Sequence, residues 1–235
     1  DMGGLGFNLK WNMGWMNDMC HYLKMDPWFR QGNHKDITFS MFYAFSENYV
    51  LPLSHDEVSE GKGSLISQMP GDHNQKFAAL KAFFGYTMAH PGKKLLFMGG
   101  EFGQFVEWRF AEQLDWLLEG YPAHAKMRHF SAELNHFYQK HPAFYEIERE
   151  QGDWKGFLWL NAEDGDNSVL SFLRKDSSGK ESIAVVLNFT PVARPNYLVG
   201  VPKAGEYEVC LNTNSKTFGG DGKGNRKVKA KKISA

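Results

Sequence analysis

A histidine and several carboxylates lie next to short apolar runs of this sequence. The apolar run 49–53 ends just before His55, Asp56 and Glu57, and Glu101 follows the run 94–98. Carboxylate oxygens accept hydrogen bonds from sugar hydroxyls, and carboxylate pairs carry out glycoside chemistry through an oxocarbenium-like transition state. Chemistry on sugars is therefore compatible with these residues. On spacing alone, a polar turn in which His55 and Asp56 are only solvated, or cap the next element, is favoured about two to one over a catalytic role.

The elements around these residues favour an active-site edge. The run 49–53 is typical of a strand buried on both faces, and 94–98 predicts a second buried strand, with a helix over 74–89 between them. The polar residues then follow the carboxyl ends of neighbouring strands. In α/β barrels and open sheets, active sites are built at that end because its loops vary while the strands hold them rigidly.

The chain changes character near residue 146. Before it, strands alternate with helices predicted at 14–25, 38–45, 74–89 and 123–140, which predicts parallel strands joined by crossovers. After it, short strands are predicted at 157–160, 169–173, 183–189, 197–201 and 207–211, as in an antiparallel sandwich or barrel, followed by a solvated loop in the Gly- and Lys-rich tail 219–232. Phe39, Phe42 and Phe45 recur every three residues and are predicted to pack in the core.

Composition excludes several functions. The 27 basic and 27 acidic residues cancel, so there is no general electrostatic case for nucleic acid or a membrane as a partner. No apolar run approaches the ~20 residues of a membrane span. Cys20 and Cys210 have no metal-ligand spacing. We therefore expect no metal or cofactor, and a reducing cytosol as the location. The aromatic content of 15% is compatible with rings that stack on sugars.

Other catalytic motifs are missing. A triad built on Ser54, His55 and Asp56 is not expected, because adjacent residues of extended chain point to opposite faces and no Gly-x-Ser-x-Gly elbow occurs. The loop 61–64 lacks the earlier glycine of a phosphate loop, since Asp56 holds that position. There is no His-Glu-x-x-His string.

Several ordered strings carry a family resemblance. They are GGLGF at 3–7, KWNMGWMN at 10–17, LPLSHDEV at 51–58, GKGSL at 61–65, MPGD at 69–72, QKF at 75–77, HPGKKLLFMGGEFGQ at 90–104, EW at 107–108 and LDW at 114–116. Together they closely resemble bacterial glycogen branching enzymes of the α-amylase superfamily, and VLNFTPV at 186–192 extends the resemblance more loosely. One departure is Ser59-Glu60, where the family usually has Val-His.

The resemblance implies a catalytic (β/α)8 barrel followed by a β-sandwich. Residues 1–145 would supply about the last three β/α units of the barrel, and residues 146–235 an incomplete sandwich. Asp56 would hydrogen-bond the sugar at the cleavage site and stabilise the transition state, with His55 binding the same sugar. Glu101, Trp11 and Trp108 are weaker candidates for substrate contacts, because each is equally compatible with packing or capping.

The family's reaction cleaves an α-1,4-glucan through a covalent intermediate and transfers the chain to a 6-hydroxyl, forming an α-1,6 branch. Its nucleophile and general acid lie in motifs that would precede Asp1, so we expect this chain alone to be inactive, with an α-glucan as its partner. Two alternatives remain open. One is a hydrolase or debranching relative of the same superfamily, and the other is a non-catalytic carbohydrate-binding module.

Overall fold

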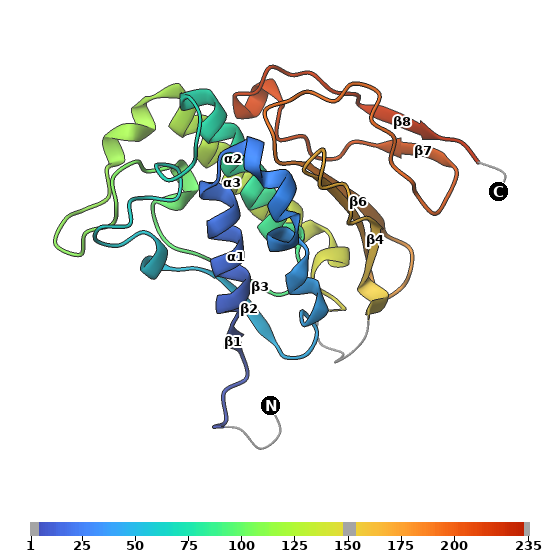
Figure 1. Cartoon of the computed structure of the whole chain (residues 1–235), viewed down its shortest axis with the longest axis horizontal. Helices are drawn as coiled ribbons and strands as arrows, with labels where there is room; N and C mark the ends of the chain where they lie inside the picture. The colour runs from blue at the N-terminus through green and yellow to red at the C-terminus, as the bar shows by residue number, and fades with distance from the viewer. Residues whose placement is uncertain (1–4, 148–153, 233–235) are drawn as a thin grey trace.

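The computed structural model describes residues 5–147 and 154–232, which leaves Gly3 and Gly4 of the first family string outside the described residues. In the range 5–147, parallel strands alternate with helices (Figure 1). The strands are β1 Lys10–Trp11, β2 Tyr49–Leu53 and β3 Lys93–Leu96, and the α-helices are α1 Met13–Lys24, α2 His73–Ala89 and α3 Pro122–Lys140. The sheet order is β1-β2-β3 with both neighbouring pairs parallel, which confirms the predicted parallel organisation.

The strands differ in burial. β2 is central in the sheet and is buried from Val50 to Leu53, as predicted. β3 was expected to be buried as well, but its residues are half-buried and Leu96 is exposed. The reason is that β3 lies at the edge of the sheet and has no second neighbouring strand among the described residues.

Short 3-10 helices lie between the strands and α-helices along the described chain. They are η1 Pro27–Ile37, η2 Phe39–Phe42, η3 His55–Glu57, η4 Gly100–Phe102, η5 Trp116–Gly120, η6 Pro142–Phe144, η7 Trp154–Gly156 and η8 Lys216–Phe218. The predicted α-helix at 38–45 is therefore wrong, because only η2 and turns form there. A 3-10 helix has three residues per turn, so Phe39 and Phe42 share a face, and that face points to solvent. Of the three predicted core phenylalanines only Phe45 is buried.

Local signals fix both ends of α2. Asp72 accepts a hydrogen bond from Gln75 N (2.9 Å), and the Gln75 side chain accepts one from Asp72 N (2.9 Å), which forms a capping box. At the other end, Pro91 disfavours the helical conformation for the residue before it, and His90 is extended. The helix therefore begins and ends close to where the sequence predicts.

The later part of the chain forms antiparallel sheets. One has the order β4-β5-β6 and the other pairs β7 with β8. Their bounds are β4 Phe157–Asn161, β5 Val169–Lys175, β6 Ser182–Asn188, β7 Gly205–Glu208 and β8 Lys227–Ala230. The predicted strand at 197–201 does not form, and residues 227–230 of the tail are a strand rather than loop.

A single apolar core runs through both parts of the chain. Figure 1 shows the sheet of β4–β6 beside the helices of the first part. At this contact the ring of Tyr86, on α2, lies 6.4 Å from Phe172 and 5.9 Å from Phe189. Phe189 also meets Tyr22 of α1 edge-on at 5.6 Å. Folding of the first part therefore buries apolar surface of the second.

Buried Arg30 joins the end of α1 to the end of β6. Its guanidinium donates to Leu23 O (3.0 Å), Met25 O (3.2 Å) and Phe189 O. The last carbonyls of a helix have no partner within the helix and carry partial negative charge, so a cation is favourable there. Burial lowers the pKa of Arg30 without removing its role as a donor.

Arg174 makes the corresponding connection from β5. It is 1% exposed and donates to Ala89 O at the end of α2 (2.6 Å). It also donates to Phe144 O (3.0 Å) and Gly156 O (3.3 Å). One side chain thus fixes three segments of backbone by charge-assisted hydrogen bonds.

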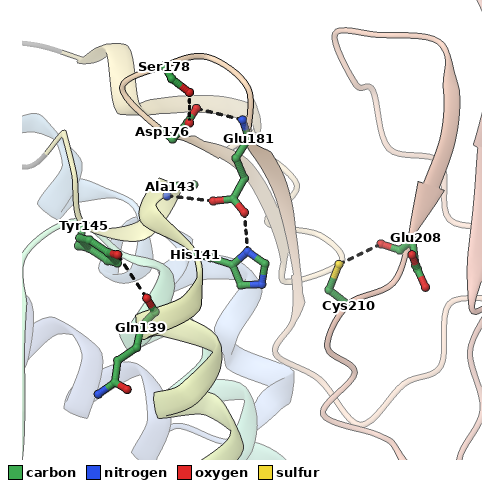
Figure 2. A network of polar contacts seen from close by, with 9 residues as sticks. All are labelled: Gln139, His141, Ala143, Tyr145, Asp176, Ser178, Glu181, Glu208 and Cys210. Carbon is green, nitrogen blue, oxygen red and sulfur yellow. Dashed lines mark hydrogen bonds and ion pairs between the residues drawn. The ribbon is translucent and has the colours of Figure 1, made fainter.

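A carboxylate completes the junction near the surface. Figure 2 shows Glu181, just before β6, bonded to His141 Nδ1 (2.5 Å) and accepting from Ala143 N (3.2 Å). Glu181 N in turn donates to Asp176 (3.0 Å), which fixes the turn between β5 and β6. The turn is therefore held against the segment that follows α3.

Candidate active site

His55 and Asp56 lie together in η3, directly after the carboxyl end of β2. Ser54 caps this turn by accepting from Asp56 N (3.2 Å). His55 Nε2 is 3.3 Å from Asp56 Oδ1, and both side chains are 49% exposed. The expectation that neighbouring residues here point to opposite faces is wrong, because the backbone is a 3-10 turn rather than extended chain. The imidazole and the carboxylate can therefore reach one bound molecule.

Aromatic rings support His55 from the loop after β3. Trp108 meets the imidazole edge-on at 6.0 Å, and Phe97 lies 5.9 Å from it. The Trp108 and Phe97 rings pack at 5.1 Å, and both residues line a small, largely apolar pocket with Leu53. Packing of this kind limits the rotamers of His55 and leaves its ring beside an apolar surface.

The Glu57 side chain points into the protein, unlike the side chains of His55 and Asp56. It is 8% exposed and lies 3.7 Å from Lys62 Nζ. Burial, together with the charge of Glu57, raises the pKa of the nearby Cys20 thiol to about 12. Cys20 is therefore a protonated, inert thiol, and Glu57 belongs to the support of the site rather than to its open face.

The remaining predicted contacts are spread along the edge of the sheet. Trp11 ends β1 and is partly exposed. Glu101 lies in η4, where its carboxylate accepts from Gly99 N (2.7 Å) and its carbonyl accepts from Ser131 Oγ (2.8 Å). The structure brings Trp108 to the His55–Asp56 pair, whereas the contacts of Glu101 are with its own turn and α3.

Two polar side chains whose role the sequence analysis did not predict hold the loop after the pair. Glu107 accepts from Gly61 N (3.0 Å) and Gly63 N (3.2 Å). Gln68 donates to backbone carbonyls of the same loop. Glu107 is distant in sequence from the glycines it binds, so no local pattern reveals the contact. The sequence signal here is the pair of glycines, because Gly61 (φ 81°) and Gly63 (φ 75°) adopt positive φ angles that favour glycine.

Within residues 5–147 and 154–232, no three His, Cys, Asp or Glu side chains are grouped so that they could hold a metal ion. None of the helices described there is long and apolar enough to cross a membrane.

Relatives were found over almost the whole chain. The 1,4-α-glucan branching enzyme of Aquifex aeolicus is 56% identical over 224 residues, which are 95% of this chain and 35% of that enzyme. The branching enzyme of Halothermothrix orenii is 51% identical over 97% of this chain and 36% of its own length. The chain is a relative of the 1,4-α-glucan branching enzymes. It spans about a third of the length of these curated branching enzymes.

Other comparisons place the fold beside the amylases. Residues 159–234 match the family described as the α-amylase C-terminal all-beta domain. A type I pullulanase from Bacillus subtilis, solved with maltose, superposes with a TM-score of 0.61 at 14% identity, over 89% of this chain and 31% of the pullulanase. The α-amylase of H. orenii gives 0.54 at 16% identity, over 87% of this chain and 46% of the amylase. At these identities the superpositions show the fold, while the branching enzymes supply the sequence relationship.

Proposed function

We propose that these residues act as part of a 1,4-α-glucan branching enzyme and supply His55 and Asp56 to its active site. The main support is the identity of more than half with branching enzymes, combined with the open His55–Asp56 pair at the carboxyl end of a parallel strand. We propose further that β1–β3 are strands of a (β/α)8 barrel, with the boundary to a β-sandwich domain near residue 146. A cytosolic location stays a prediction.

In this proposal Asp56 and His55 bind the sugar ring whose bond is broken. The Asp56 carboxylate accepts hydrogen bonds from ring hydroxyls, which favours the distorted, positively charged transition state. His55 donates to the same sugar, held in place by the rings of Trp108 and Phe97. Trp11 and Glu101 remain candidates for weaker contacts with the glucan.

Retaining transfer needs a nucleophile and a general acid with carboxyl groups about 5–5.5 Å apart. We propose that these come from the part of the branching enzymes that this chain does not match. Loss of a covalent nucleophile in another enzyme lowers turnover by about a million-fold, so we expect the 235-residue chain alone to be inactive.

An iodine-staining assay tests the proposal. We would compare the 235-residue chain with a longer protein that also carries the region matching the rest of the branching enzymes. The longer protein should form α-1,6 linkages, and its Asp56→Asn variant should lose at least about 100-fold in turnover, as expected when a transition-state contact is removed. Branching by the 235-residue chain alone would contradict the assignment of the bond-breaking groups to another segment.

The same protein separates the alternatives. A hydrolase or debranching enzyme would release reducing ends without forming new α-1,6 linkages. A glucan-binding module would bind glycogen equally well after Asp56→Ala, with the binding confined to residues after 146. The first result would overturn branching as the function, and the second would favour the binding module.

A further inference from the structure

The loop that follows the His55–Asp56 pair is closed by a carboxylate from the loop after β3. At Gly61 and Gly63 the backbone has positive φ, and the N–H groups of both residues point to Glu107 Oε2 at 3.0 and 3.2 Å. Nearby amides that converge in this way form a site for an acceptor oxygen. Here the protein supplies that oxygen itself, from the loop after β3.

Gln68 holds the same loop by donating to the loop's backbone carbonyls. Its amide nitrogen lies 3.1 Å from Glu57 O, 2.8 Å from Lys62 O and 3.1 Å from Gly63 O. Glu107 therefore accepts hydrogen bonds from backbone N–H groups of the loop, and Gln68 donates to its backbone carbonyls. The two side chains leave little freedom for the backbone between residues 57 and 63.

Both attachments lead back to the pair in η3. Gln68 binds the carbonyl of Glu57, the residue after Asp56. Trp108, next to Glu107 in the chain, donates its backbone N–H to Val58 O at 2.7 Å while its ring packs against His55. Movement of Glu107 would thus loosen the loop after Asp56 and the ring beside His55 at once.

We propose that Glu107 is a positioning residue that holds His55 and Asp56 in place for the glucan without touching it. The inference rests on the proposed function for its effect on turnover, but the attachment itself is a property of the backbone. The contact requires an oxygen acceptor at this reach and does not require a negative charge. A glutamine can present its amide oxygen to both glycines, whereas an alanine cannot.

The test combines hydrogen exchange with branching kinetics, using Glu107→Ala, Glu107→Gln and, as a control, Glu112→Ala. Glu112 is an exposed carboxylate of the same loop that pairs with Arg109. In Glu107→Ala, exchange of the amides in segment 59–64 should accelerate by about 10-fold or more, since both hydrogen bonds to the side-chain oxygen are lost at once. Glu107→Gln and Glu112→Ala should keep exchange within a few-fold of the parent.

Turnover should follow the exchange. A displacement of the pair by about 1 Å can cost roughly 100-fold, so Glu107→Ala should lower kcat by about 10- to 100-fold, with a smaller change in KM and with Glu107→Gln restoring most of the rate. If Glu107→Gln is as inactive as the alanine variant, the charge itself is needed and the proposal is wrong. Unchanged exchange in Glu107→Ala would also overturn it.

A substitute variant and the exchange data keep failure of the Glu107 proposal separate from failure to fold and from failure of the proposed function. If Glu107→Ala does not fold, Glu107→Asp replaces it, because the shorter side chain cannot reach both glycines and should give the same faster exchange. If the parent protein forms no branches, the proposed function fails, while the exchange of segment 59–64 still decides whether Glu107 holds the loop.

Discussion

His90 is a titratable side chain enclosed in the core, at 1% exposure. Its Nδ1 lies 2.7 Å from Pro91 O, which can only accept, so Nδ1 carries the hydrogen. Nε2 then accepts from Ser40 Oγ at 2.8 Å. Burial, with smaller contributions from the charges of Lys94 and Arg174, lowers the pKa of His90 to about 3. The imidazole is therefore neutral with a defined tautomer.

This burial predicts acid sensitivity. In the unfolded chain His90 titrates near its ordinary pKa of about 6.5. Below that pH the unfolded state therefore binds a proton at His90 that the folded state does not bind. His90 alone should lower the free energy of unfolding by up to about 1.4 kcal/mol per pH unit as the pH falls from 6.5 towards 3. Urea titrations of the parent and of His90→Gln at pH 7, 6 and 5 measure the difference.

The glutamine variant should be less stable at pH 7 and should show a flatter dependence on pH. His34, whose pKa burial also lowers, contributes equally to both proteins and cancels in the comparison. Parallel pH profiles for the two proteins would contradict a neutral, enclosed His90.

At the scale of elements, the capping box makes α2 the helix most clearly defined by its own residues. Replacing Asp72 by alanine removes the acceptor for Gln75 N and should lower the free energy of unfolding by about 1 kcal/mol. Asp72→Asn keeps an acceptor and is the matched control. The measurement is urea unfolding followed by circular dichroism. Equal stability of the two variants would show that the cap does not stabilise α2 in this setting.

The extent of successful prediction follows from how local each signal is. α2 could be predicted because a capping residue precedes it and a proline follows it closely. β2 could be predicted because it is itself an apolar run. β8 could not, since its alternating Lys and small apolar residues become a strand only by pairing with β7. The pair His55–Asp56 was visible from its place after a strand. Glu107 was not, because its partners are backbone amides more than 40 residues away.

At the scale of the whole molecule, the shared core and the buried arginines unite the parallel and antiparallel parts. Arg174→Met would fill a similar volume but leave the carbonyls of Ala89, Phe144 and Gly156 without their donor. We expect a loss of about 2–4 kcal/mol, since the penalty for buried unpaired groups dominates such changes. Arg174→Lys should be intermediate, because an ammonium cannot reach all three carbonyls.

The unfolding transition should also be shared. Tryptophan fluorescence and far-ultraviolet circular dichroism should give the same urea midpoint in the parent, and both midpoints should fall together in Arg174→Met. Separate transitions for the parallel and antiparallel parts would contradict a single cooperative unit.

The acceptors described above for Arg30 and Arg174 are main-chain oxygens, which every amino acid possesses. Substitutions at Ala89, Phe144 or Phe189 can change the packing but cannot delete the acceptor, whereas any change at Arg30 or Arg174 removes the guanidinium that donates to several carbonyls at once. In a saturation mutagenesis library, tolerance should therefore be strongly unequal across each contact, with the arginines intolerant and their partners limited only by size. The residues that supply the carbonyls can thus change in sequence, while the two arginines preserve the geometry of the interface.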